Sequence, residues 1–268
     1  METRGIQSFR WLGAEATHLD RPAIATCGPV AIGCYGGNTR AGAARNEDAA
    51  LVWCAPDAAW EFALLVDAHF TAQSAALLLE AVASEQQAIA GILSGPPEQF
   101  TGALGAHLVG LFTSAAFRAR CREVEGEASC LICARRAGYV WWLSVGDVVL
   151  HLFHPELARL GQFTLNQRHF FEWIGERNTF DLPVPCYSTG VRELLPGANT
   201  VLLTTDGLFE YAGAPFADPA QLYRLFTAGA ADAMPNQARE ALAQVHRGRG
   251  RDSATLIAWR HHLLDEPL

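Results

Sequence analysis

Four aspartates lie at the ends of apolar runs, where short acidic side chains at the rim of a sheet can act together on one ligand. Asp48 opens the run AALVW, and Asp252 opens SATLIAW. Asp67 closes FALLV, and Asp206 closes TVLLTT. Asp also favours turns, so each aspartate taken alone has an ordinary structural explanation. Because adjacent antiparallel strands bring several such ends to one edge, we expect the carboxylates to repel one another unless a cation neutralises them.

The donor types in this set select hard metal ions. Oxygen donors without a cluster of thiolates or imidazoles favour magnesium or manganese(II) over zinc. Two such ions about 3.5 to 4 Å apart can activate water and clamp a phosphate. Cys130 and Cys133 have CxxC spacing, but they stand alone in a run of strand composition, where positions three apart face opposite sides. We therefore expect the cysteines to be buried free thiols of a reducing compartment.

The charge composition excludes several classes of protein. All 20 basic residues are arginine, so the chain has no lysine for a P-loop, a kinase site or a Schiff base. A formal charge of −8 is the wrong sign for a nucleic-acid partner and suits a cation. The run from His246 to Arg251 could dock an anionic substrate or nucleic acid, but a charge run before a strand is usually a solvated loop.

The N-terminal sequence METRGIQSFRWLG lacks the apolar run of a signal peptide. No segment reaches the roughly 18 uninterrupted apolar residues that a membrane span needs. We therefore expect a cytoplasmic protein with no membrane partner and no nucleic-acid partner.

The elements that must position the aspartates follow from composition and periodicity. Strand-like runs cover residues 30–37, 49–55 and 62–68, and helical patterns cover 71–91 and 98–122. Three more runs with tight connections, 128–136, 139–145 and 148–153, predict an antiparallel meander. Residues 155–199 have no sustained period and predict loops with one or two short elements. A strand at 200–206, helices at 218–227 and 235–247 and a strand at 253–260 complete the chain.

This order is neither the β–α alternation of a parallel sheet nor all-β. It indicates an α+β protein with antiparallel sheets and helices on their outer faces. The sequence has no repeat, low-complexity tract or linker, so we expect residues 1–268 to form a single domain.

Five short motifs follow one another in an order that is specific although each motif is weak. They are Arg45-Asn46-Glu47-Asp48, Val66-Asp67-Ala68-His69, Ser144-Val145-Gly146-Asp147, Thr205-Asp206-Gly207-Leu208 and Asp252-Ser253-Ala254-Thr255. Together they resemble the protein phosphatase 2C family of metal-dependent serine/threonine phosphatases, the PPM type, from about Gly33 to Arg260. The resemblance implies a four-layer α-β-β-α fold, an antiparallel β-sandwich of two sheets flanked by helices on both outer faces.

The resemblance also implies a binuclear Mn²⁺ or Mg²⁺ centre. It makes Asp67 the carboxylate that bridges both ions and the backbone carbonyl of Ala68 a ligand. Glu47 belongs to the second ion, and Asp206 and Asp252 belong to the first.

Two further acids have less direct roles in this resemblance. Asp48 holds metal-bound water. Asp147 matches the aspartate linked to a third, weaker ion, although Gly-Asp in a tight connection is also simply a good turn.

The chain departs from the family pattern at three places. Ala68 replaces the usual Gly, which matters only if the backbone there needs a positive φ. Ser253 replaces the usual Asn, which removes an amide but keeps a small hydrogen-bonding residue. The phosphate-binding arginine usually precedes the acidic motif by several residues; here Arg45 touches the motif and Arg40 lies further back, and we favour Arg45.

His69 follows Asp67 by two residues, so both side chains leave an extended strand on the same face. A lone histidine at a strand end is more often structural. In the family a histidine at this place is a candidate general acid for the leaving alcohol, and an unperturbed pKa near ~6.5 suits that role. Both interpretations stay open.

The resemblance implies a phosphatase that removes phosphate from serine or threonine in a phosphorylated protein, by direct attack of metal-bound water. We expect the protein to be a monomer. The alternative is a regulatory binding module that keeps the fold without turnover. The acids that would hold the ions and their water are all present, which favours the enzyme.

Overall fold

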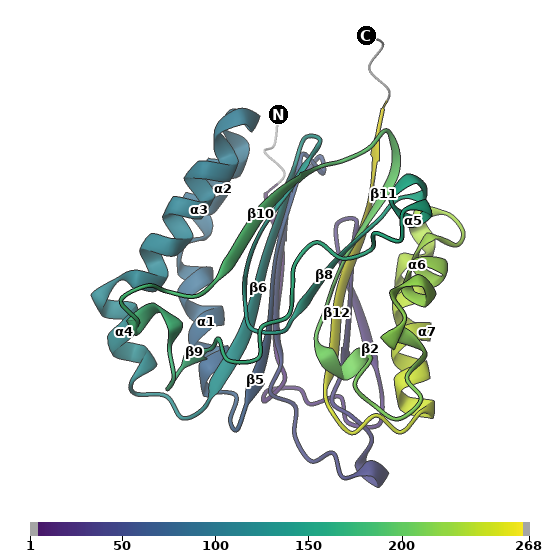
Figure 1. Ribbon diagram of the computed structural model, residues 1–268, viewed down its shortest axis with the longest axis horizontal. Coiled ribbons are helices and arrows are strands. Elements are labelled where there is room, and N and C mark those ends of the chain that lie inside the picture. The colour runs from purple at the N-terminus through teal and green to yellow at the C-terminus, as the bar shows by residue number, and fades with distance from the viewer. Residues whose placement is uncertain (1–4, 265–268) are drawn as a thin grey trace.

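In a computed structural model that describes residues 5–264, two antiparallel sheets pack face to face between two layers of helices (Figure 1). The first sheet has the strand order β1 (Gln7–Leu12), β4 (Ala49–Cys54), β5 (Trp60–His69), β6 (Glu127–Arg136), β7 (Tyr139–Val145) and β10 (Ser188–Glu193). The short β9 (Ile174–Gly175) also pairs with β6. The second sheet has the order β2 (Ala23–Cys27), β3 (Val30–Tyr35), β12 (Ala254–Leu263), β11 (Gly197–Thr204) and β8 (Val149–Phe153).

The helices are divided between the two outer faces (Figure 1). The first sheet is covered by α1 (Gln73–Ser84), α2 (Gln86–Ser94), α3 (Pro97–Thr113) and α4 (Ala115–Cys121). The second sheet is covered by α6 (Pro219–Thr227) and α7 (Met234–Arg247), and α5 (Pro155–Arg159) follows β8. Five short 3-10 helices complete the elements: η1 (Thr39–Ala41), η2 (Thr179–Asp181), η3 (Asp206–Leu208), η4 (Pro215–Ala217) and η5 (Ala231–Ala233). The α+β fold with four layers is confirmed.

Successive side chains of a strand point to opposite faces of its sheet, so a strand of apolar residues contributes to the core on both faces. In β5, Leu64 and Val66 pack under the helices, whereas Ala63 and Leu65 pack between the sheets. Asp67 continues the second set, so its position in the strand directs it into the space between the sheets. The cysteines of the CxxC pair obey the same rule: Cys130 lies in the helix-side core and Cys133 in the inter-sheet core, as predicted. Cys186 differs from the prediction because it is exposed.

Both long helical patterns are broken once. The helix predicted over 71–91 divides at Glu85 into α1 and α2. The helix predicted over 98–122 divides at Ser114, whose extended backbone ends α3 and whose side chain accepts a hydrogen bond from the Phe117 N–H to begin α4. Serine competes for helical N–H groups in this way, so it starts a helix more readily than it continues one.

No single helix within residues 5–264 is both long enough and apolar enough to cross a membrane. The pairs α1–α2 and α3–α4 reach the required length and composition only when joined across bends of 55° and 54°. Both pairs pack on the first sheet.

The predicted three-strand meander is wrong at its last strand. β6 and β7 form a hairpin, but β8 leaves the first sheet and pairs with β11 of the second. Gly146 makes this crossing with φ +87°, and a Cβ there would lie 2.2 Å from Oγ of Ser129. The crossing places Asp147 between the ends of the two sheets. The structure also adds β1 and β2, which no sequence pattern predicted. Residues 155–199 contain α5, β9, η2 and β10, where one or two short elements were expected.

Candidate metal and phosphate site

Three aspartates that are remote in sequence converge at one end of the sandwich. Asp67 lies near the end of β5 in the first sheet, Asp147 lies on the crossing from β7 to β8, and Asp206 begins η3 directly after β11 of the second sheet. One carboxylate oxygen from each lies within 4.8 Å of the other two. Asp67 and Asp206, two of the four predicted strand-end acids, therefore lie together with Asp147, and the cluster joins acids of both sheets.

Burial and mutual repulsion make the ionised form of these carboxylates unfavourable. Loss of hydration raises the pKa of Asp67 well above its usual range, and the charges of Asp48, Asp206 and Asp252 raise it further. Burial, followed by the charges of Asp147 and others, raises the pKa of Asp206 to about 8. Carboxylates in this state take up protons or a cation, and their oxygen-only chemistry fits a hard divalent ion.

Asp48 is a fully buried carboxylate held by hydroxyl groups. Its Oδ1 accepts a hydrogen bond from Oγ of Ser253 at 2.9 Å. Its Oδ2 accepts from Oγ1 of Thr255 at 2.6 Å and from Oγ1 of Thr205 at 3.3 Å. Burial raises the pKa of Asp48 to about 7. Ser253 thus supplies a hydrogen bond where the family has Asn, and the role of Asp48 toward metal-bound water stays a prediction.

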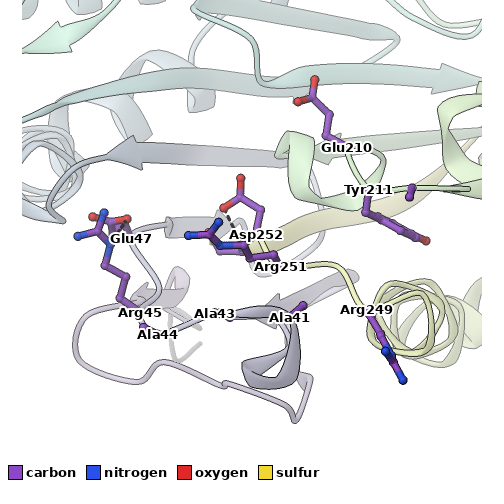
Figure 2. A pocket seen from close by; sticks show the side chains of 13 residues that line it. Ala41, Ala43, Ala44, Arg45, Glu47, Glu210, Tyr211, Arg249, Arg251 and Asp252 are labelled. Atoms are coloured by element: carbon purple, nitrogen blue, oxygen red, sulfur yellow. Dashed lines mark hydrogen bonds and ion pairs between the residues drawn. The ribbon is translucent and has the colours of Figure 1, made fainter.

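A cavity of about 770 Å³ lies beside the acids (Figure 2). Its charged lining residues are Arg45, Glu47, Glu210, Arg249, Arg251 and Asp252. In Figure 2, Arg45 lies beside Glu47 and Arg251 lies beside Asp252, whereas the side chain of Arg249 points away from them. Positive and negative groups therefore line the same cavity.

Glu47 has one satisfied oxygen and one orphaned oxygen. Oε2 pairs with Nε of Arg45 at 2.9 Å. Oε1 is buried and has no hydrogen-bond partner within residues 5–264. A buried carboxylate oxygen without a partner is costly unless something else binds it, so Glu47 fits the ligand role implied for it.

The backbone at Ala68 does not need glycine. Ala68 lies inside β5 opposite Ala128 of β6, so its backbone is extended, and its side chain packs in the core under the helices. The replacement of the family's Gly therefore carries no strain here. Whether its carbonyl binds an ion stays a prediction.

The two arginines considered for phosphate binding lie in different surroundings. Arg45 lines the cavity and its side chain is 65% exposed. Arg40 lies in η1, is exposed, and does not line the cavity. Of the two arginines, Arg45 alone lines the cavity, and its role in phosphate binding stays a prediction.

The arginines of the run before β12 are exposed, as expected of a solvated loop, and Arg249 and Arg251 also line the cavity. The N–H of Asn38 donates to the carbonyl of Gly250 at 2.9 Å, and Nδ2 of Asn38 donates to the carbonyl of His246 at 3.2 Å. These bonds join the run to the loop that carries Arg45. Arg251 thus lines the same cavity as Arg45, and the docking of an anionic substrate by this run stays a prediction.

His69 ends β5 on the face that Asp67 uses, and it is exposed. Its ring meets the ring of Trp173 edge to face, with centroids 5.2 Å apart. Burial raises the pKa of Glu47, and the charges of Arg45 and His69 partly oppose this rise, which places the imidazole near Glu47 of the cavity. Both the structural and the catalytic interpretation remain compatible with this position.

Arg168 belongs to the site and was missed entirely. Its Nη2 lies 3.3 Å from Oδ2 of Asp147, 3.3 Å from Oδ2 of Asp206 and 2.5 Å from Oε1 of Glu210. It stands in the stretch 155–199, which has no periodicity, and no motif marks it.

No protein-family model and no curated protein sequence matches the chain. Solved structures match it over nearly their full length. A bacterial serine phosphatase has a TM-score of 0.63 at 13% identity, covering 89% of this chain and 99% of that one. PppA, a regulatory component of T6SS in Pseudomonas aeruginosa, has a TM-score of 0.61 at 17% identity, covering 87% and 97%.

The catalytic domain of the serine/threonine protein phosphatase PstP, solved with 2 manganese ions, has a TM-score of 0.57 at 14% identity, covering 97% of this chain and 100% of that one. Identities this low establish the fold rather than the activity. The chain therefore has the fold of the protein phosphatase 2C-type serine/threonine phosphatases, as the five motifs predicted.

Proposed function

We propose that this protein is a metal-dependent phosphatase that hydrolyses phosphoserine or phosphothreonine esters in a protein substrate. The observation that carries the proposal is the convergence of Asp67, Asp147 and Asp206 oxygens within 4.8 Å, next to a cavity walled by arginines. Carboxylates attract divalent cations, and arginine forks bind phosphate oxygens. A phosphate ester needs both kinds of charge within reach.

The acids fit the ligand roles that the resemblance implies. Asp67 would bridge two Mn²⁺ or Mg²⁺ ions, with Asp206 and Asp252 on one ion and Glu47 on the other. The carbonyl of Ala68 would complete the set. Bound ions would supply the positive charge that lowers the pKa of water and neutralises the phosphate. The orphaned Oε1 of Glu47 and the raised pKa of Asp206 support this assignment.

Residues of the chain would bind and orient the ester. Arg45 would hold the phosphate oxygens from the cavity wall, with Arg251 beside it. His69 would give a proton to the departing serine or threonine oxygen. Asp48 would help to hold the attacking water, while its own position is set by three hydroxyl groups.

The proposal is tested by phosphate release from a phosphothreonine peptide with Mn²⁺ or Mg²⁺, without added metal, and with excess chelator. Asp67→Asn should abolish turnover, because a charged ligand shared by two ions becomes neutral. Glu80→Gln is the matched control, since Glu80 is an acid that pairs with Arg120 on the helix layer away from the cavity. Full turnover in excess chelator would overturn the metal centre. Binding of phosphopeptide and Mn²⁺ without any turnover would establish the alternative, a binding module.

A further inference from the structure

The guanidinium of Arg168 is enclosed by carboxylates of the acid cluster. Nη2 lies 3.3 Å from Oδ2 of both Asp147 and Asp206, and 2.5 Å from Oε1 of Glu210. Nε donates to the backbone carbonyl of Asp147 at 3.2 Å. Only 24% of the arginine side chain is exposed. The group therefore occupies a place bounded by oxygens on several sides, as a bound cation does.

Two aromatic rings hold the same guanidinium. Its Cζ lies 4.7 Å from the ring centroid of Phe170 and 5.1 Å from that of Phe209. Phe170 belongs to the same segment as Arg168, and Phe209 follows η3. Cation–π contacts of this length add to the ion pairs and restrict the planar group. Arg168 is thus held by residues from three separate parts of the chain.

The carboxylate of Asp147 is engaged at both oxygens. Oδ1 accepts a hydrogen bond from Oγ of Ser129 at 2.5 Å, and Oδ2 pairs with Arg168. The N–H of Asp147 donates back to Oγ of Ser129 at 3.2 Å. An additional divalent ion on Oδ2 of Asp147 would stand directly against the guanidinium and be repelled by it.

Asp206 differs from Asp147 in this respect. Arg168 contacts Asp206 through Oδ2 alone, whereas Asp147 is also bonded at Oδ1 by Ser129. The contacts of Arg168 with the cluster therefore fall on Asp147 and Asp206, and none falls on Asp67 within the described residues.

We propose that Arg168 is a resident cation of the site: its guanidinium occupies the edge between Asp147 and Asp206 and excludes a third divalent ion there. This inference rests on the proposed function, because it concerns the number of ions that the proposed metal centre binds. It replaces the expectation that Asp147 supports a weak third ion. A guanidinium neutralises carboxylates but cannot coordinate water, so the protein would work with two ions.

The test counts Mn²⁺ ions bound to the purified protein, by calorimetry and by electron paramagnetic resonance of free Mn²⁺, independently of activity. We expect two ions in the wild type. Arg168→Gln should bind a third ion, or bind it at least 10-fold more tightly than the wild type does. Arg168→Lys keeps the charge and should remain at two. Adding Asp147→Asn to Arg168→Gln should remove the third ion again.

Two further variants keep the test decisive. Arg118→Gln is the matched control, since Arg118 pairs with Asp181 at 2.5 Å outside the acid cluster, and it should bind two ions. Glu210→Gln is measured instead if Arg168→Gln fails to fold. The Glu210 variant removes the 2.5 Å ion pair that holds the Arg168 guanidinium in place. It should also tighten binding of a third ion.

The outcomes separate the two proposals. Three ions of equal affinity in the wild type would overturn the role of Arg168, and so would two ions in the wild type, Arg168→Gln and Glu210→Gln alike. Either result leaves the proposed metal centre standing. No bound Mn²⁺ in the wild type would overturn the metal centre itself, and the inference with it.

Discussion

Thr255 donates its hydroxyl to Oδ2 of Asp48 at 2.6 Å, joining two residues 207 positions apart in the chain. Asp48 precedes β4 of the first sheet and Thr255 lies in β12 of the second. The carboxylate is fully buried, and this bond is the shortest of the three that hydroxyl groups donate to it. The two sheets are thus joined by a polar contact directly beneath the acid cluster.

Thr255→Val should destabilise the protein by about 1–3 kcal/mol, the usual cost of leaving a buried polar group with a lost partner. Valine keeps the shape of threonine, so the loss reports the hydrogen bond rather than a cavity. Urea unfolding of the metal-free protein measures it. Thr113→Val is the control, because Thr113 bonds only to carbonyls of its own helix. Equal stability of both variants would contradict a role for the inter-sheet bond.

The metal-free protein should lose stability as the pH rises towards about 7 and about 8. The pKa of Asp48 is raised to about 7 and that of Asp206 to about 8 in the folded state, above the usual value of an unfolded aspartate. Each group therefore stabilises the fold while it is protonated in the folded state. That contribution falls by about 1.4 kcal/mol per pH unit from the unfolded pKa of about 3.9 up to the folded pKa, and it is constant above the folded pKa.

Urea unfolding at pH 6.5, 7.5 and 8.5 in chelator measures this slope, which should be shallower between pH 7.5 and 8.5 than between pH 6.5 and 7.5. Asp206→Asn should flatten it, since an amide does not titrate. His151 acts in the opposite direction at lower pH: burial lowers its pKa to about 4, so it costs stability as the pH falls from about 6.5 to 4. A wild-type slope that Asp206→Asn leaves unchanged would show that other groups cause it.

Arg45→Ala should lower kcat/KM on a phosphothreonine peptide by roughly 10- to 100-fold, because hydrogen bonds to charged groups contribute about 1.5–3 kcal/mol. Arg40→Ala should change it less than about 2-fold, since Arg40 does not line the cavity. Because Arg45 also pairs with Glu47, calorimetry must show that Mn²⁺ affinity is retained. The reverse order of losses would assign the phosphate to Arg40.

The role of His69 can be separated by the leaving group. A serine or threonine alkoxide is strongly basic and leaves only if protonated, whereas p-nitrophenolate needs no proton. If His69 is the general acid, His69→Ala should lose roughly 100-fold on the phosphothreonine peptide and much less on p-nitrophenyl phosphate. A structural His69, held against Trp173, would reduce both rates by similar factors. The measurement is made at saturating Mn²⁺.

Local patterns were sufficient for the acids at strand ends. Asp48, Asp67, Asp206 and Asp252 flank apolar runs that form β4, β5, β11 and β12, so these strands and the approach of Asp67 to Asp206 followed from sequence. The position of Asp147 did not, because the short connection between β7 and β8 looks like a hairpin. Only the distant pairing of β8 with β11 shows that it crosses between sheets.

Arg168 shows a different limit. Its segment has no periodicity, and its place is set by Asp147, Asp206 and Glu210, which approach it only in the folded chain. Arg45 and Arg40 were also hard to separate, because their difference depends on the path of one loop around the cavity. Sequence thus predicts acids on strands better than arginines on loops.

Asp67 belongs to the first sheet and Asp206 follows the second, so an ion that binds both links ion binding to the packing of the sheets. Any cation that binds both carboxylates connects the two sheets, and separating the sheets would require releasing the cation. Such linkage adds about 2.7 kcal/mol to the free energy of unfolding when the free ion is at 100 times its dissociation constant. The melting temperature would then follow the ion concentration, so the supply of divalent metal would govern how long the fold survives as well as how fast it works.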